Sequence, residues 1–246
     1  MRSNPGRPSS PPGVSIITCT NRASFIHTIF RNYSRQLHAK KELIIVINSS
    51  RIPLSVYRNA ARKYPHVHVF RLSERYTLGA CLNYAVKRSR YPYIAKFDDD
   101  DYYAPYYLTD SLQAFKRTGA DIVGKRAHYM VLRGSKALLL RFAQDENRYV
   151  DILPGATLVM KRKVFRSVSF PNQSVGEDDG FCMRSRKRGF KIYSASKFNF
   201  VAIRRKNSHG HTWIISDQTL LAHHKRIRGV TNIPRFISRM PKVVPR

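Results

Sequence analysis

Residues 97–105 read FDDDDYYAP, and this stretch decides how the rest of the chain is interpreted. Ahead of it lies YIAKF (93–97), which is short, largely apolar and preceded by Pro92, as expected of a buried strand. Behind it, Pro105 begins a segment whose apolar side chains recur at helical spacing. The four carboxylates of residues 98–101 are therefore predicted at the carboxyl end of a strand, where open α/β sheets bind their ligands.

The four adjacent carboxylates repel one another, so their clustering needs a physical reason. Hard oxygen ligands of this kind suit Mg²⁺ or Mn²⁺, and a bound cation would relieve the repulsion. The alternative is a solvated acidic turn that precedes a helix N-terminus. Neither interpretation is settled by this stretch alone.

The charge of the whole chain gives the acidic run its context. The sequence holds 45 Lys and Arg against 15 Asp and Glu, for a formal net charge of +30. Nucleic acid, phosphate-rich substrates and anionic membranes would all attract such a protein. Seven of the 15 acids, however, fall in two groups, at residues 98–101 and 177–179. This distribution indicates an acidic site embedded in a basic surface.

Length and composition limit the possible classes of protein. The 246 residues, 42% of them hydrophobic, allow one α/β domain or two small ones with a sizeable core. No apolar run approaches the roughly 20 residues of a membrane span. The expected location is the cytoplasm, with peripheral contact at the inner face of an anionic membrane as an open alternative. The three cysteines are far apart and match no zinc or disulfide spacing.

Strand and helix patterns alternate along the first half of the chain. Residues 1–13 are rich in Pro, Gly, Ser and Asn and are predicted to be a disordered tail. Strands are then expected at 14–18, 43–47, 67–70 and 93–97, with amphipathic or Gly-started helices between them. This alternation predicts βαβ units and a Rossmann-like, mostly parallel sheet flanked by helices.

The second half is less regular. Residues 125–149 show no clean period, whereas GEDDG at 176–180 predicts a loop that approaches a ligand, followed by a helix that ends at Gly189. We expect a single domain at residues 14–215 and a basic C-terminal extension at 216–246.

In this order and at these separations, the landmarks resemble those of bacterial, inverting family-2 glycosyltransferases with the GT-A fold. The resemblance runs from about residue 14 to residue 213. Its pieces are the segments 14–22, 42–50, 78–83, 98–105, 154–157 and 176–178. It implies transfer of a sugar from a nucleoside diphosphate sugar, expected to be UDP-linked, to a hydroxyl of a glycan, polymer or protein. Cell-envelope or spore-surface polysaccharide synthesis is the expected pathway.

The resemblance also implies roles for residues on the donor side. The end of the first strand would pack around the nucleotide, with contacts from Thr18, Thr20, Asn21 and Arg22. The family often has an acid after the second strand, and here Asn48 stands in its place; an amide can still pair with a pyrimidine edge.

The metal and diphosphate roles fall on the acidic run and on one late histidine. Asp98 would face the ribose, and Asp100, assisted by Asp98, would bind the Mg²⁺ or Mn²⁺ that bridges the diphosphate. Asp99 is assigned to the nucleotide, although Asp99 or Asp101 could share either role. His211 is a further candidate ligand, and a surface histidine is the equal alternative.

The second acidic group would supply the general base. A poor hydroxyl nucleophile needs a base to take its proton during attack. In inverting relatives this base is the Asp of a Glu-Asp pair, which corresponds to Asp178 here. Glu177 and Asp179 would then contact the acceptor. The competing interpretation is that residues 177–179 only stabilise the start of a helix.

Two other functions remain to be weighed. A sugar-phosphate nucleotidyltransferase also uses acidic metal ligands on a Rossmann-like sheet, but it would normally carry a Gly-rich loop after the first strand, and TCTNR at 18–22 has no Gly. A non-enzymatic protein that binds nucleic acid or another polyanion fits the charge but shows no recognition motif. We therefore expect no nucleic-acid partner.

Overall fold

The apolar run LIIVI at residues 43–47 lies in the second strand from one edge of the larger of two β-sheets. The computed structural model describes residues 11–206 and 215–241. In it β2 (Lys41–Ile47) pairs in parallel with β1 (Val14–Thr20) on one side and β3 (Val67–Arg71) on the other. Residues 43, 45 and 47 pack into one hydrophobic cluster, and residues 44 and 46 pack into another. A continuous apolar run is required because both faces of the strand are buried.

The larger sheet is extended beyond β1 by short strands. β4 (Tyr93–Lys96) is parallel to β1, and β10 is antiparallel to both β4 and β6. β11 is parallel to β6, and β9 closes the sheet in antiparallel orientation. The full strand order is β3-β2-β1-β4-β10-β6-β11-β9, in which the last four strands are β10 (Val159–Lys161), β6 (Ile122–Gly124), β11 (Ile192–Ser194) and β9 (Arg148–Tyr149).

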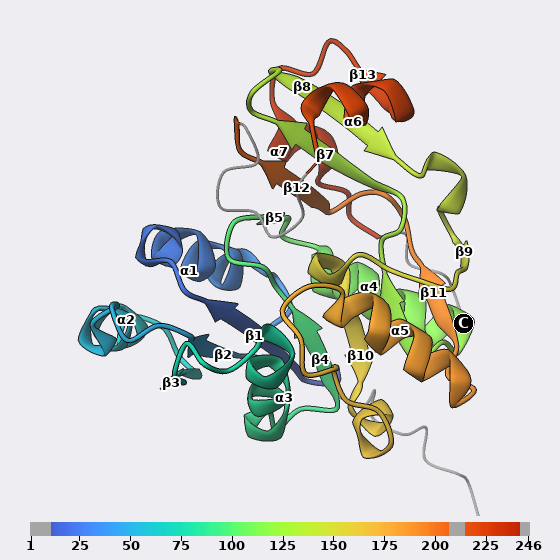
Figure 1. The fold of residues 1–246 in the computed structure, drawn as a ribbon. Helices are drawn as coiled ribbons and strands as arrows, with labels where there is room; N and C mark the ends of the chain where they lie inside the picture. The colour runs from blue at the N-terminus through green and yellow to red at the C-terminus, as the bar shows by residue number, and fades with distance from the viewer. Residues whose placement is uncertain (1–10, 207–214, 242–246) are drawn as a thin grey trace, which may run out of the picture.

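Helices cover both faces of this sheet (Figure 1). One face packs against α1 (Ile26–Arg35), α2 (Leu54–Ala61) and α4 (Tyr107–Thr118). The other packs against α3 (Leu78–Arg88) and α5 (Glu177–Lys187). The predicted α/β fold, a mostly parallel sheet flanked by helices, is confirmed.

Residues 125–150, which had no clean sequence period, contribute to a second sheet. β7 (His128–Leu132) and β8 (Ala137–Arg141) form a hairpin, and β12 (Phe200–Arg204) adds in parallel to β7. Leu138 and Leu140 belong to one hydrophobic cluster and Leu139 to another, so both faces of β8 are covered and the usual alternation is absent. This sheet has the order β13-β8-β7-β12-β5, with β5 at Tyr102–Tyr103 and β13 at Lys225–Ile227. It lies at the top of Figure 1.

The described part of the basic C-terminal extension is docked on this second sheet. β13 (Lys225–Ile227) pairs with β8, and the short helices α6 (Asp217–His223) and α7 (Ile233–Ile237) flank it. Leu220 and Ile237 are fully buried in the two clusters that cover the sheet. Of the predicted tail at residues 1–13, only residues 11–13 are described, and they lead into β1.

The fold brings the sequence landmarks to one edge of the larger sheet. The loops that follow β1, β2 and β4 all contribute to a single cavity there. The N-terminus of α3 is tied to the segment before α5, because the Gly79 N–H donates to the Gln173 carbonyl at 3.0 Å. A Cβ on Gly79 would lie 1.8 Å from the Pro171 carbonyl oxygen, so only glycine permits this approach.

Among the described residues, no helix combines the length and hydrophobicity needed to cross a bilayer.

Candidate active site

The four aspartates after β4 have four different environments, although they are adjacent in sequence. Asp98, with 37% of its side chain exposed, accepts a hydrogen bond from Lys96 Nζ at 2.5 Å. Lys96 is almost fully buried at the end of β4. Burial opposes its charge, but the carboxylates of Asp98 and Glu177 outweigh this and raise the pKa of Lys96. The lysine therefore remains charged and holds Asp98 at the sheet edge.

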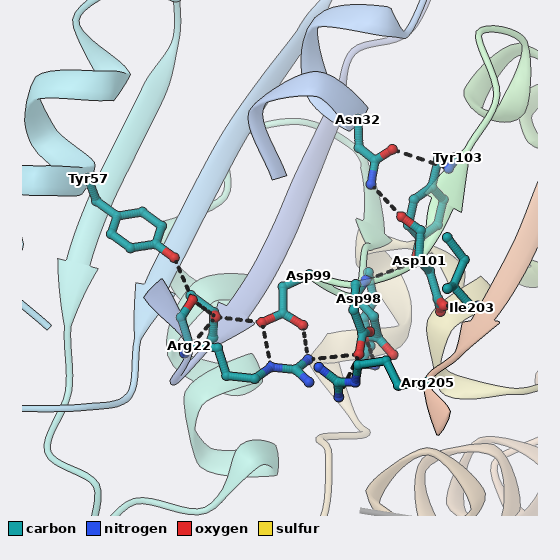
Figure 2. A network of polar contacts seen from close by, with 12 residues as sticks. Arg22, Asn32, Tyr57, Asp98, Asp99, Asp101, Tyr103, Ile203 and Arg205 are labelled. Carbon is teal, nitrogen blue, oxygen red and sulfur yellow. Dashed lines mark hydrogen bonds and ion pairs between the residues drawn. The ribbon is translucent and has the colours of Figure 1, made fainter. Parts of the chain in front are cut away.

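Asp99 is buried and joins the end of β4 to the end of β1. Its carboxylate accepts a hydrogen bond from Thr20 Oγ1 at 2.5 Å and from Arg22 Nε at 3.2 Å, and it forms an ion pair with Arg22 Nη2. Tyr57 from α2 supports the arginine by donating to its backbone carbonyl at 3.0 Å (Figure 2). Burial raises the pKa of Asp99, and the Arg22 contacts oppose that rise.

Asp100 lies between two arginines from opposite ends of the domain. Its Oδ2 is 3.0 Å from Arg22 Nη2 and 3.3 Å from Arg205 Nη2. Both guanidinium groups also approach the ring of Phe25, at 4.5 and 5.1 Å from its centroid. The charge of this carboxylate is therefore balanced by two guanidinium groups, which a cation bound at Asp100 would have to replace.

Asp101 contacts β12 and α1, and its share in nucleotide or metal binding stays a prediction. Its carboxylate accepts a hydrogen bond from the Ile203 backbone N–H of β12 at 2.8 Å. Its backbone carbonyl accepts from Asn32 Nδ2 of α1, also at 2.8 Å (Figure 2). It is buried and lines neither of the two cavities at this edge. Asp101 instead joins the two sheets.

The first cavity, of about 260 Å³, lies at the ends of β1, β2 and β4. Most of the residues predicted to bind the nucleotide and metal line it: Thr20, Asn21, Arg22, Asn48, Asp98, Asp99 and Asp100. Asn48 is held at the wall because its Nδ2 donates to the Ser73 carbonyl at 2.7 Å. Thr18 is not brought together with them, since it is buried within β1. Cys19, Leu78 and Ser174 also line the cavity and were not anticipated as site residues.

The second acidic group lies at the start of α5. Asp178 Oδ2 accepts the Gly155 N–H at 2.7 Å, and its Oδ1 accepts the Asp179 N–H at 2.9 Å. A Cβ on Gly155 would lie 2.7 Å from Asp178 Oδ2, so glycine is needed for this contact. Glu177 is buried, and this burial, aided by the charge of Asp178, raises its pKa to about 7. Burial and Asp178 also raise the pKa of Asp179.

A second cavity, of about 430 Å³, connects the two acidic groups. Glu177, Asp178 and Asp179 line it together with Asp98 and Lys96. Asp98 and Leu78 line the first cavity as well, so the two cavities share a wall. The predicted proximity of the two acidic groups, about 80 residues apart in sequence, is thus observed.

The side chains of the acidic run by themselves supply only part of the ligands that a small divalent cation needs. Within residues 11–206 and 215–241, no group of three Asp, Glu, His or Cys side chains could hold a metal ion. Asp98 and Asp100 nevertheless line the same cavity, and Mg²⁺ typically takes one or two carboxylates and completes its shell with substrate phosphates and water. The donor set fits a cation that arrives with a diphosphate. His211, the third predicted ligand, lies outside the described residues.

The comparison with protein families assigns the chain. The model of glycosyl transferase family 2 matches residues 15–188, most of its length. The chain belongs to this family. No curated protein is significantly similar to the chain.

Solved structures share the fold of this family-2 glycosyltransferase. S. aureus TarS 1–349 in complex with UDP-GlcNAc superposes with a TM-score of 0.67 at 18% identity, covering 83% of this chain and 62% of that one. Mannosyltransferase PcManGT from Pyrobaculum calidifontis, in complex with GDP-Man and Mn²⁺, gives 0.63 at 19% identity, with 82% and 59% covered. The chain thus spans less than two thirds of these structures.

Proposed function

We propose that this chain is an inverting, metal-dependent hexosyltransferase that moves a sugar from a nucleoside diphosphate sugar to an acceptor hydroxyl. The observation that carries the proposal is the shared wall at Asp98, which joins a cavity lined by the aspartate run to one lined by Asp178. A donor in the first cavity would present its sugar carbon to an acceptor in the second.

The donor is assigned to the first cavity from the groups that line it. Arg22 can contact phosphate oxygens, and Thr20 and Asn48 offer neutral polar groups to ribose and base. UDP is the nucleotide we propose, because the Asn48 amide can pair with a pyrimidine edge. Among the fold relatives, one binds UDP-GlcNAc and another GDP-Man. Asp98 and Asp100 would hold Mg²⁺ or Mn²⁺, which when bound neutralises charge on the leaving diphosphate.

The reaction in this proposal is a single displacement. The acceptor oxygen forms a bond to the anomeric carbon while the bond from that carbon to the diphosphate oxygen breaks, and the diphosphate leaves with the electron pair. The acceptor proton passes to Asp178, whose carboxylate is held by the Gly155 and Asp179 N–H groups. Attack from the face opposite the leaving group inverts the configuration. Lys96 holds Asp98 in position through their ion pair.

The remaining parts of the proposal are the acceptor contacts, the cellular location and the class of acceptor. Glu177 and Asp179 lie beside Asp178 in the acceptor cavity, where their carboxyl groups would bind acceptor hydroxyls. The chain's net charge of +30 supports peripheral contact with an anionic membrane in the cytoplasm. A glycan of the bacterial envelope or spore surface remains the acceptor we propose, on the basis of the sequence resemblance.

The test compares two conservative substitutions. Asp178→Asn preserves size but cannot accept a proton, so turnover should fall on the order of 10²-fold or more while nucleotide affinity stays unchanged. Asp100→Asn should show the reverse pattern, with Mn²⁺-dependent binding of nucleoside diphosphate impaired in calorimetric titrations. Near-normal turnover in Asp178→Asn would exclude this residue as the base. Unchanged Mn²⁺-dependent affinity in Asp100→Asn would remove the metal assignment.

A further inference from the structure

Two arginines line the cavity that contains Asp178. Arg126 lies between β6 and β7, and Arg141 is the last residue of β8. Neither arginine belongs to the two acidic groups, at residues 98–101 and 177–179, that contain the proposed metal ligands and general base. They come from the second sheet and its connection, so the acceptor cavity is formed between the two sheets.

One aromatic ring holds both arginines. The guanidinium carbons of Arg126 and Arg141 lie 4.1 and 4.8 Å from the centroid of the Phe142 ring, which also lines the cavity. Phe142 has φ 46° and ψ 49°, in the left-handed region that bulky residues rarely adopt. Such backbone conformations are strained and tend to occur at functional sites. The strained residue keeps two like charges beside one ring.

The charges around this pair are unevenly distributed. Arg126 has Asp145 at 3.6 Å and also lies close enough to Asp179 to act on its pKa. Burial, and then repulsion by Arg126 and Arg204, lowers the pKa of Arg141 to about 10. Arg141 Nε donates to His224 Nε2 at 3.2 Å, and burial together with Arg141 lowers the pKa of that histidine.

The charged groups that line this cavity with Arg126 and Arg141 are Lys96 and the carboxyl groups of Asp98, Glu177, Asp178 and Asp179. His128, which also lines the cavity, stays neutral because burial lowers its pKa to about 3. An anion bound in this cavity would relieve the repulsion between Arg126 and Arg141.

We propose that Arg126 and Arg141 bind an oxyanion of the acceptor, a phosphate or a carboxylate, beside the hydroxyl that Asp178 deprotonates. Arginine suits this role because its planar guanidinium donates two parallel hydrogen bonds to either oxyanion. The acceptor class is then a hydroxyl compound with its own negative charge. This inference rests on the proposed function, which makes the second cavity the acceptor site.

The experiment measures nucleotide release from a UDP-sugar with Mn²⁺ in the presence of three small acceptors. Glycerol carries hydroxyls alone, glycerol phosphate adds a phosphate, and glycerate adds a carboxylate. The parent should release nucleotide faster with glycerol phosphate or glycerate than with glycerol, and the comparison of the two anions identifies the oxyanion. Arg141→Gln and Arg126→Gln should each lose about 10-fold or more of that advantage, the scale of a charge-assisted hydrogen bond.

Arg133→Gln is the matched control. It removes the same charge from an exposed arginine that lines neither cavity of the active site. It should retain the preference for anionic acceptors. An equal loss in Arg133→Gln, or no preference in the parent, overturns the inference in favour of a general effect of the basic surface or of a neutral acceptor.

A second measurement separates this inference from the proposed function. Without donor or metal, glycerol phosphate or glycerate should raise the melting temperature of the parent and of Arg133→Gln more than glycerol does, and should not do so for Arg141→Gln. If this difference is present but no UDP-sugar is turned over, the oxyanion site stands and the donor assignment fails. If turnover occurs but neither anion has an effect in either assay, the inference fails and the proposed function stands.

Discussion

Glu177 provides a quantitative test of the electrostatics in the second cavity. Its side chain is only 6% exposed, and burial raises its pKa from 4.5 to about 7. Because the folded-state pKa is above the unfolded value, the folded protein binds this proton more tightly. The stability associated with Glu177 is then present at low pH and is lost as the pH rises from about 4.5 to about 7.

The size of the effect follows from the same two values. Proton linkage between pKa 4.5 and about 7 predicts that this residue alone costs about 2.5 kcal/mol of unfolding free energy between about pH 5 and pH 8. Glu177→Gln keeps the size of the side chain and removes the titration. The variant should therefore lose about 2.5 kcal/mol less than the parent over that interval.

Urea denaturation of both proteins at pH 5 and pH 8 measures this difference. Other carboxyl groups titrate in the same interval, so the informative quantity is the pH-induced change in the variant minus that in the parent. Asp151→Asn, at a side chain that is 70% exposed, is the control and should behave like the parent. If Glu177→Gln and the parent lose the same stability, the burial argument for Glu177 is refuted.

Two further predictions concern packing. Gly155→Ala would place a Cβ 2.7 Å from Asp178 Oδ2, so the carboxylate must shift. Because catalysis depends on the position of this group, kcat should fall by about 10²-fold. Nucleotide affinity, measured by titration with UDP and Mn²⁺, should be unchanged. Parent-like turnover would show that the position of Asp178 is not critical. Ile237→Ala removes a fully buried side chain of the C-terminal extension and should cost about 2–5 kcal/mol in urea denaturation, whereas a loss near zero would mean that the extension does not contribute to the core.

Patterns that depend on neighbouring residues were read correctly from the sequence. The run at 43–47 is buried on both faces, as its continuous apolar character predicted. The aspartates do follow β4 at the edge where three other loops converge. In each case the determining interaction is local, because strand period and strand ends are encoded within a few residues.

Features that depend on distant partners could not be read in this way. Asp98 to Asp101 are identical residues, and only their partners distinguish them. Asp101 is bonded to Ile203, and Asp100 is paired with Arg205, both about 100 residues away along the chain. Thr18 was expected in the site from its position near the strand end, but strand alternation and burial keep it within the sheet.

Lys96 is the residue that sequence reasoning missed, and it connects the two halves of the site. A lone lysine inside an otherwise apolar strand, directly before an acidic run, was the available signal. Buried lysines ordinarily lose their charge, yet the pKa of Lys96 rises because Asp98 in the first cavity and Glu177 in the second both act on it. The positive charge in turn lowers the pKa of Glu177 against the effect of burial. The first and second cavities therefore share the influence of one buried cation, so a change of charge in either cavity alters the electrostatics of the other.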